Sequence, residues 1–259
     1  MSRIVPALQL RSSGRMLTLR NGGDFANRQI RRYLTVALFC LGVTVAVILA
    51  GRYIDLPFPG LIITATLIVL FKASFRRWRN WLVGKRGEEA VAHVLKALSN
   101  DYALLNDIVL PGGAGNVDHF LVGSNGLFVI ETKNYSGWVR CEGDRWFVGR
   151  REINSLSKQA KRNSMTIRTN LARLHAEKGV KVPYVNALLV FVNKDTKLKL
   201  FSPTIAVLRL EELVEYIRNF KGGPTISNNQ KHAIVRHLQS LQSEAIPIPA
   251  AKQASQLTA

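Results

Sequence analysis

The most informative pattern of apolar and polar positions lies near the middle of the chain, at residues 116–137. Two apolar runs, 117–122 and 127–133, are separated by a short turn rich in Gly, Ser and Asn. Strand-like runs joined by such a turn predict a β-hairpin. The second run ends with Glu131 and Lys133, which share a face because strand side chains alternate. A carboxylate and an ammonium in an apolar strand are costly to remove from water, so the pattern indicates a function.

The length of the turn decides which hairpin residues face each other. A two-residue turn at 125–126 would place Asp118 opposite Lys133, and a four-residue loop over 123–126 would place it opposite Glu131. Both registers put Asp118 on the face that carries Glu131 and Lys133, because the side-chain period is two. A three-residue loop would break this arrangement.

Two uncharged runs nearer the N-terminus predict membrane-spanning helices. Residues 33–51 contain no charged side chain, and as a helix they would be about 28 Å long, roughly the hydrocarbon thickness of a bilayer. Residues 56–71 would be about 24 Å long, so a re-entrant or interfacial segment is the alternative there. We expect a two-helix transmembrane hairpin over residues 31–72. The long charged leader and the second apolar run argue against a cleaved signal peptide.

Basic residues flank this predicted hairpin on both sides. Seven Lys and Arg residues precede Tyr33 and four lie between Lys72 and Arg79, whereas the link between the runs carries one Arg and one Asp. The positive-inside rule therefore places both termini in the cytoplasm. We expect a multi-pass protein of a bacterial inner membrane, with the C-terminal domain in the cytoplasm.

The rest of the pattern predicts a cytoplasmic α/β domain over residues 84–242, with a mixed sheet flanked by helices. The antiparallel hairpin excludes a purely parallel sheet. Residues 1–30 have no sustained period and predict a mobile basic tail, and residues 243–259 predict a disordered tail. Besides the hairpin, the pattern predicts helices at 88–98, 154–177, 210–220 and 228–242, and strands at 104–109, 138–141, 146–148, 185–192 and 204–208.

The formal net charge of +19 favours a polyanionic partner, with nucleic acid first and anionic lipid second. The segment 85–242 alone has 23 basic and 14 acidic residues. The predicted helix 154–177 and the residues after it suit either a solvated face or a surface that follows phosphates. Trp138 and Trp146 are expected in the core rather than as base-stacking platforms. The basic residues of the helix region are Lys158, Lys161, Arg162, Arg168, Arg173, Lys178 and Lys181.

Three carboxylates are candidates for chemistry. Asp118 and Glu131 offer a hard cation the two carboxylates that Mg²⁺ commonly takes from a protein. Glu88 lies on the apolar face of its predicted helix, whereas Glu89 lies on the polar face. Lys133 could orient a water or stabilise charge on a phosphate. The alternative is a structural salt bridge. The five histidines show no ligand spacing.

These residues resemble the nuclease-related domain (NERD) family, which is placed in the PD-(D/E)xK nuclease superfamily. The resemblance covers roughly residues 84–200. It implies a restriction-endonuclease-like core and Mg²⁺-dependent cleavage of phosphodiester bonds, of DNA more than of RNA, with Mn²⁺ as a possible substitute. It rests on Gly84-Lys-Arg-Gly-Glu88, on Asp118-His, on Glu131-Thr-Lys133-Asn-Tyr-Ser-Gly137 and on a following helix that carries a glutamine.

The resemblance also implies roles by position. The catalytic set would be Glu88, Asp118, Glu131, Lys133 and Gln159, and the metal ligands would be Asp118, Glu131 and Glu88. Family members often have Asn-Pro before the helix, where this chain has Asn-Ser. The prediction is a membrane-anchored, Mg²⁺-dependent nuclease. The alternatives are a catalytically silent, membrane-anchored module that binds nucleic acid or protein, and a membrane-associated assembly factor.

Overall fold

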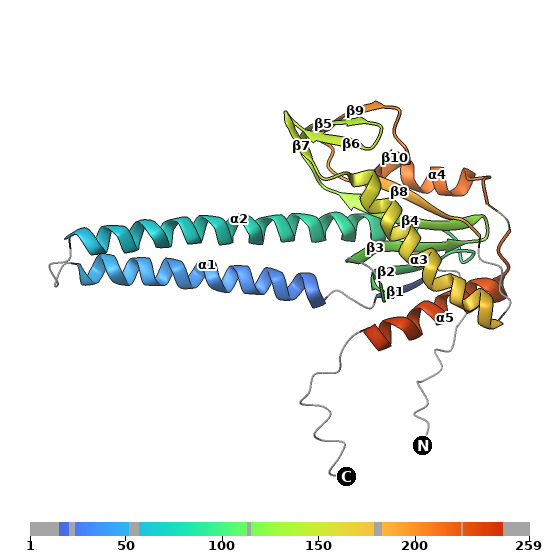
Figure 1. Cartoon of the computed structure of the whole chain (residues 1–259), viewed down its shortest axis with the longest axis horizontal. Helices are drawn as coiled ribbons and strands as arrows, with labels where there is room; N and C mark the ends of the chain where they lie inside the picture. Colours follow the sequence, from blue (N-terminus) through green and yellow to red (C-terminus); the bar gives the residue numbers. More distant parts are fainter. Residues whose placement is uncertain are drawn as a thin grey trace, which may run out of the picture.

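The sheet that contains the predicted hairpin has six strands in the order β1-β2-β3-β4-β8-β10 (Figure 1). The computed structural model describes residues 16–20, 24–51, 57–112, 115–178, 183–223 and 225–245. The β2-β3 and β3-β4 pairs are antiparallel, and the β4-β8 and β8-β10 pairs are parallel, so the sheet is mixed as predicted. Its strands are β1 (Leu17–Arg20), β2 (Ala103–Val109), β3 (Asn116–Gly123), β4 (Gly126–Lys133), β8 (Val185–Phe191) and β10 (Ala206–Arg209).

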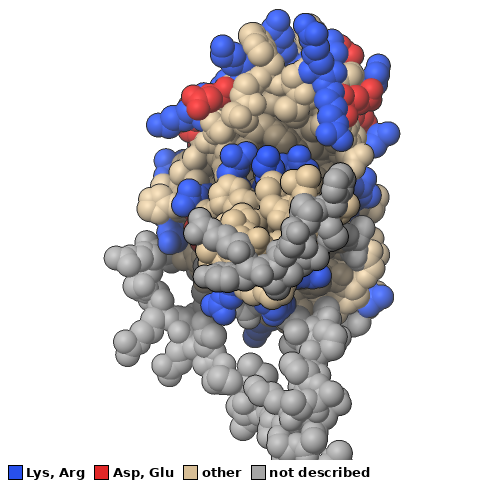
Figure 2. Space-filling model, turned by 90° about the vertical axis from the view of Figure 1, so that its left-hand side faces the viewer, with Lys and Arg blue, Asp and Glu red and all other residues tan. Residues whose placement is uncertain are grey.

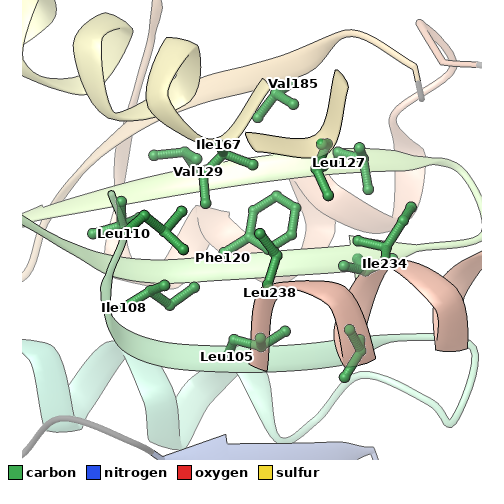
Figure 3. Packing of buried hydrophobic residues seen from close by; sticks show 14 of the residues in the cluster. Leu105, Ile108, Leu110, Phe120, Leu127, Val129, Ile167, Val185, Ile234 and Leu238 are labelled. Atoms are coloured by element: carbon green, nitrogen blue, oxygen red, sulfur yellow. The ribbon is translucent and has the colours of Figure 1, made fainter. Parts of the chain in front are cut away.

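Helices cover both faces of this sheet, so nearly every residue of its central strand β4 is buried. Helices α3 (Leu156–Lys178) and α5 (Asn228–Ala245) pack on one face, around Phe120 (Figure 3). The C-terminal part of α2 (Pro57–Leu95) packs on the other face, with the short helices η1 (Leu210–Glu212) and α4 (Leu213–Asn219). A strand buried on both faces has an almost continuous apolar run, which is why β4 shows weak alternation in the sequence.

A second sheet, in the order β7-β6-β5-β9, extends the fold. The strands predicted at 138–141 and 146–148 form its β5-β6 pair, whereas β7, β9 and the sheet as a whole were not expected from the sequence. Its inner side packs Val139, Cys141 and Trp146 against Leu156 and Phe191. The chain enters this sheet twice, because β4 leads into β5 and β8 leads into β9, and β5 and β9 pair in parallel. Its strands are β5 (Gly137–Glu142), β6 (Arg145–Val148), β7 (Arg151–Ile153) and β9 (Thr196–Phe201).

Helix α1 (Asp24–Ala50) lies along the first part of α2, and the two helices project from the sheet as a long hairpin (Figure 1). Within the described residues, one helix is long and apolar enough to cross a membrane, Ala26–Ala50, with a mean hydropathy of 2.5 and only 11% of it buried. This finding rests on length and composition, which a signal sequence can also satisfy.

The predicted two-helix transmembrane hairpin is therefore not what the structure contains. The second apolar run, 56–71, is not a separate span, because α2 continues through Lys72 and Arg76 as one helix to Leu95. Lys and Arg are good helix formers, so a change from apolar to basic residues ends the apolar run without ending the helix.

Two predicted tails also differ from the structure. Residues 17–20 form β1, which pairs in parallel with β2, and Met16 is buried, so this part of residues 1–30 is not a mobile tail. A four-residue edge strand is too short to give a sequence period. The predicted disordered tail 243–259 overlaps α5, which ends at Ala245. Residues 1–15 and 246–259 lie outside the described residues.

Candidate active site

The hairpin turn sets the register that brings the acidic residues together. Gly123 pairs with Gly126, so the turn has two residues, Ser124-Asn125, and lies one position earlier than the predicted two-residue turn. Asn125 Nδ2 donates to the Ile217 carbonyl over 2.6 Å and fixes the turn against α4. The pairing of His119 with Ile130 continues by one position to Asp118 opposite Glu131. This is the pairing predicted for the four-residue loop.

Glu131 lies at the centre of a hydrogen-bond network, and its side chain is only 2% exposed. Its Oε1 accepts from Lys133 Nζ over 2.7 Å and from Gln159 Nε2 over 2.5 Å. Its Oε2 accepts from Asn163 Nδ2 over 2.9 Å. Lys133 Nζ also donates to Gln159 Oε1 over 3.1 Å. We call these four residues the Glu131 cluster; each contact holds the carboxylate in one orientation.

Helix α3 supplies two members of this cluster because Gln159 and Asn163 are four residues apart and share one helix face. Gln159 was predicted and Asn163 was not. The i, i+4 spacing of two amides on a basic helix was the available signal. The predicted pairing of Glu131 and Lys133 on one face of β4 is present in the structure.

Asp118 faces the cluster from β3. It is half-buried, and its Oδ2 accepts a hydrogen bond from the Thr132 backbone N–H over 2.8 Å. Burial raises the pKa of Asp118 well above its usual range, and the negative charges of Glu131 and Glu88 raise it further. The charge of Lys133 and the Thr132 hydrogen bond act in the opposite direction without outweighing them. Asp118 therefore lies in a site with an excess of negative charge.

Glu88 reaches the same site from α2. A Cβ at the preceding residue, Gly87, would lie 3.1 Å from Val192 Cγ2, so this glycine allows α2 to approach the sheet closely. Burial and the charges of Asp107 and Glu131 raise the pKa of Glu88 to about 7. Among the described residues Glu88 has no hydrogen bond or ion pair. Glu89 is exposed, as the helical phase predicted, and it pairs with Lys85 over 3.6 Å.

Asp107 is an acidic residue of this site that the sequence reasoning missed. Its neighbours in β2 pair with His119 and Val117, which places Asp107 across from Asp118. Its φ of 55° lies in the left-handed region, which interrupts the alternation of β2. Its Oδ1 accepts a hydrogen bond from Asn116 Nδ2. An aspartate within the predicted strand 104–109 was the signal that could have identified it.

Glu88, Asp107 and Asp118 line one cavity of about 330 Å³, and we call these three residues the acidic wall. The cavity lies between α2 and the β2-β3 edge of the site. Lys85, Lys96 and His119 also line it. The side chain of His119 is buried on the α2 face of β3, with Nδ1 2.7 Å from Asn106 Oδ1.

A divalent cation fits the chemistry of these donors in part. Within the described ranges, no group of three or more His, Cys, Asp and Glu side chains is arranged to hold a metal ion. The predicted ligand set of Asp118, Glu131 and Glu88 stays a prediction. However, Mg²⁺ takes one or two carboxylates and keeps several waters, and acids that raise one another's pKa values are stabilised by a cation between them.

The basic helix α3 borders the site. Lys158 and Arg162 are exposed, whereas Lys161 pairs with Asp144 over 3.1 Å. Arg168 and Arg173 are exposed further along the helix. The side chain of Lys178 and all of Lys181 lie outside the described residues.

The two tryptophans behave differently. Trp146 is fully buried, as predicted, and its Nε1 donates to Ser157 Oγ over 2.7 Å. Trp138 is 52% exposed, so its expected place in the core is wrong. Side chains of neighbouring residues in β5 point to opposite faces, and here the inner face is occupied by Val139 and Cys141.

Comparison with known proteins finds a family match over the region that holds the candidate site. Residues 83–192 match the family model described as the nuclease-related domain, NERD. An uncharacterized protein of Bacillus anthracis is 35% identical over 83 residues, which are 30% of this chain and 39% of that relative. The similarity thus spans well under half of either protein. No solved structure matches the chain.

Proposed function

We propose that the chain is a metal-dependent nuclease that hydrolyses phosphodiester bonds of nucleic acid, with DNA as the preferred substrate. The observation that carries the proposal is the meeting of the acidic wall and the Glu131 cluster within the region that matches the nuclease-related domain. Perturbed carboxylates beside a cavity are typical of sites of chemistry. The mixed sheet between helices also suits a restriction-endonuclease-like core.

Asp118 and Glu131 would hold Mg²⁺ or Mn²⁺, with Glu88 assisting directly or through a water. When bound, the ion polarises a phosphate and lowers the pKa of a water. The Glu131 carboxylate is already oriented by Lys133, Gln159 and Asn163, so it needs no rearrangement of its own. The acidic wall supplies negative charge that a cation neutralises.

Lys133 provides the positive charge of the site. Burial lowers its pKa, but the charge and hydrogen bond of Glu131 and the charge of Asp118 raise it more, so the pKa lies above its ordinary value. The ammonium therefore stays protonated at neutral pH. It orients the attacking water or stabilises charge on the phosphate, and Gln159 positions it. The neighbouring Lys158 and Arg162 attract the phosphate backbone.

The nuclease proposal is tested with the full-length chain purified in detergent, on a panel of DNA and RNA oligonucleotides with and without Mg²⁺. We expect cleavage that requires the metal and is lost in Lys133→Ala. Lys221→Ala removes an exposed lysine that belongs neither to the cavity lining nor to the Glu131 cluster, and this variant should cleave normally. Binding without cleavage, unchanged by Lys133→Ala, would instead support the catalytically silent binding module.

We also propose that α1 anchors the domain to a membrane, in a bacterium the inner membrane, with the site on the cytoplasmic side. The support is the apolar span Ala26–Ala50, whose large side chains Phe39, Ile48 and Leu49 are exposed. A tagged chain should remain in the membrane pellet after carbonate extraction at its full mass. A soluble, shortened product would identify α1 as a cleaved signal sequence.

A further inference from the structure

The outer face of the second sheet carries an exposed tryptophan beside two lysines. The Nζ atoms of Lys197 and Lys199 lie 5.4 and 4.6 Å from the centre of the Trp138 ring. The register pairs Trp138 with Lys197 and Arg140 with Lys199. All four side chains therefore point away from the core, and we call them the Trp138 face.

The exposure of Trp138 does not come from a loose segment. Strand β5 lies between β6 and β9, so it is paired on both sides. The Trp138 carbonyl accepts from the Gly149 backbone N–H over 2.8 Å. The residue after it, Val139, is fully buried on the inner side. The ring is thus held in place on a rigid strand, which lowers the entropy cost of binding a ligand.

The two lysines also differ from Arg140 and Arg145 of the same sheet. Arg140 pairs with Glu142 over 2.9 Å, and Arg145 pairs with Glu152 over 2.9 Å. In the part of the chain that the structure describes, Lys197 and Lys199 have no carboxylate within ion-pair distance. Two ammonium groups beside an exposed ring are therefore available to a ligand.

A flat ring beside two unpaired ammonium groups suits a polyanion that also carries flat groups. Single-stranded nucleic acid has both, because unpaired bases stack on aromatic rings and phosphates contact lysine. Duplex bases are already stacked on one another. Acidic side chains lie among basic ones in the upper part of Figure 2, where the second sheet lies. These acidic side chains would repel a broad anionic lipid surface more than a narrow nucleic-acid strand, which can contact the basic side chains alone.

We propose that the Trp138 face binds a single-stranded segment of nucleic acid, with a base stacked on Trp138 and phosphates contacting Lys197 and Lys199. This deepens the proposed function, on which it rests for the identity of that strand as substrate. Trp138 follows Lys133 by five residues, so their Cα atoms are at most about 18 Å apart. One short strand can therefore contact the Trp138 face and the candidate active site together.

The test measures binding of the full-length chain to a labelled oligo-dT strand by fluorescence anisotropy, in detergent and without divalent metal. We expect Trp138→Ala to weaken binding roughly tenfold, the effect of losing one stacked base, and Trp138→Phe to weaken it less. Binding to a blunt duplex should change little. Lys197→Ala/Lys199→Ala should lower the salt slope by about 1.4, since each phosphate on a single strand contributes about 0.7.

The control Lys221→Ala/Arg236→Ala removes the same charge from exposed positions elsewhere and should bind nearly as the unmodified chain does. Acrylamide quenching of the Trp138 fluorescence, taken as the difference from Trp138→Phe, distinguishes binding of nucleic acid from binding of anionic lipid. Oligo-dT should protect the ring, and nanodiscs containing phosphatidylserine should not. Protection by the lipid alone, or unchanged oligo-dT binding by Trp138→Ala, would overturn the inference. Because metal is absent, neither result depends on whether the chain cleaves.

Discussion

The Glu131 cluster and the acidic wall hold neighbouring carboxylates in opposite environments. Glu131 is almost completely buried, and both of its oxygens accept hydrogen bonds from Lys133, Gln159 and Asn163. Glu88 is half-buried and lacks such partners among the described residues. Its pKa of about 7 records burial and repulsion from other acids.

This difference separates two requirements of the site. A buried carboxylate that is hydrogen-bonded and paired with an ammonium is held in one position, and removing its partner is strongly destabilising. Carboxylates that raise one another's pKa values lower the stability of the folded chain at neutral pH unless a proton or a cation neutralises them. The Glu131 cluster fixes the position of one carboxylate, and the acidic wall attracts positive charge.

The largest expected effect comes from breaking the ion pair of the cluster. Lys133→Ala leaves Glu131 buried without a cation, so the free energy of unfolding should fall by about 3 kcal/mol, the scale for a broken buried pair. Urea unfolding at pH 7.5 measures this. Arg145→Ala, which breaks the exposed pair with Glu152, is the control and should lower the free energy of unfolding far less. Equal costs would contradict the comparison.

Above neutral pH, Glu88→Gln should raise the free energy of unfolding rather than lower it. The pKa of Glu88 is higher in the folded chain than in the unfolded one, so the folded chain holds more protons between about pH 4.5 and 7. Its contribution to stability is therefore lost as pH rises through this window. Glu88→Gln should stabilise the chain at pH 8 by up to about 3 kcal/mol and have little effect at pH 4.5.

Urea unfolding at both pH values checks the prediction for Glu88. The matched control is Glu89→Gln, since Glu89 is exposed on the same helix and pairs with Lys85. It should shift stability at pH 8 by under about 1 kcal/mol. A similar gain from both variants would show that helix charge, rather than the acidic wall, is responsible.

Mg²⁺ should stabilise the folded chain by neutralising the wall. At a concentration ten times its dissociation constant the gain is about 1.4 kcal/mol, measured as a rise in Tm. The gain should be larger at pH 8 than at pH 5.5, because protonation competes with the metal. Asp118→Asn should abolish it. An equal Tm rise in Asp118→Asn would place the cation elsewhere.

A smaller loss than that of Lys133→Ala is expected for Asn163→Ala, which removes one neutral donor from Glu131. The free energy of unfolding should fall by about 1 to 2 kcal/mol, because the lost hydrogen bond is made to a charged group. Thr166→Ala, one turn further along α3, is the matched helix control. A larger loss than for Lys133→Ala would mean that the amides, rather than the ion pair, hold Glu131.

Much of the site could be predicted because its residues lie in regular elements. The hairpin alternation placed Glu131 with Lys133, and the helical period separated Glu88 from Glu89. Asp107 was not predicted because its left-handed φ interrupts the alternation from which the faces of a strand are inferred. The match of residues 83–192 supports the predicted nuclease-related domain, whereas its placement in the PD-(D/E)xK superfamily stays a prediction.

The elements that were missed depend on partners distant in the sequence. Strand β9 is stabilised by pairing with β5, about sixty residues earlier, and β1 by pairing with β2 across two long helices. Short edge strands carry little period of their own. The second apolar run, 56–71, was misjudged for a different reason. Its composition indicated a separate span, but the helical hydrogen bonding of α2 continues past it.

The sequence by itself determined the hairpin, the mixed sheet and the acidic and basic residues at its end, because these follow from local periodicity and side-chain chemistry. The tertiary structure decided which carboxylates are held and which repel, since burial and charge depend on neighbours from α2, β2, β3 and α3 together. It also decided that Trp138 faces solvent and Trp146 the core. Both are aromatic residues in short strands, and only the packing of the second sheet distinguishes its two faces.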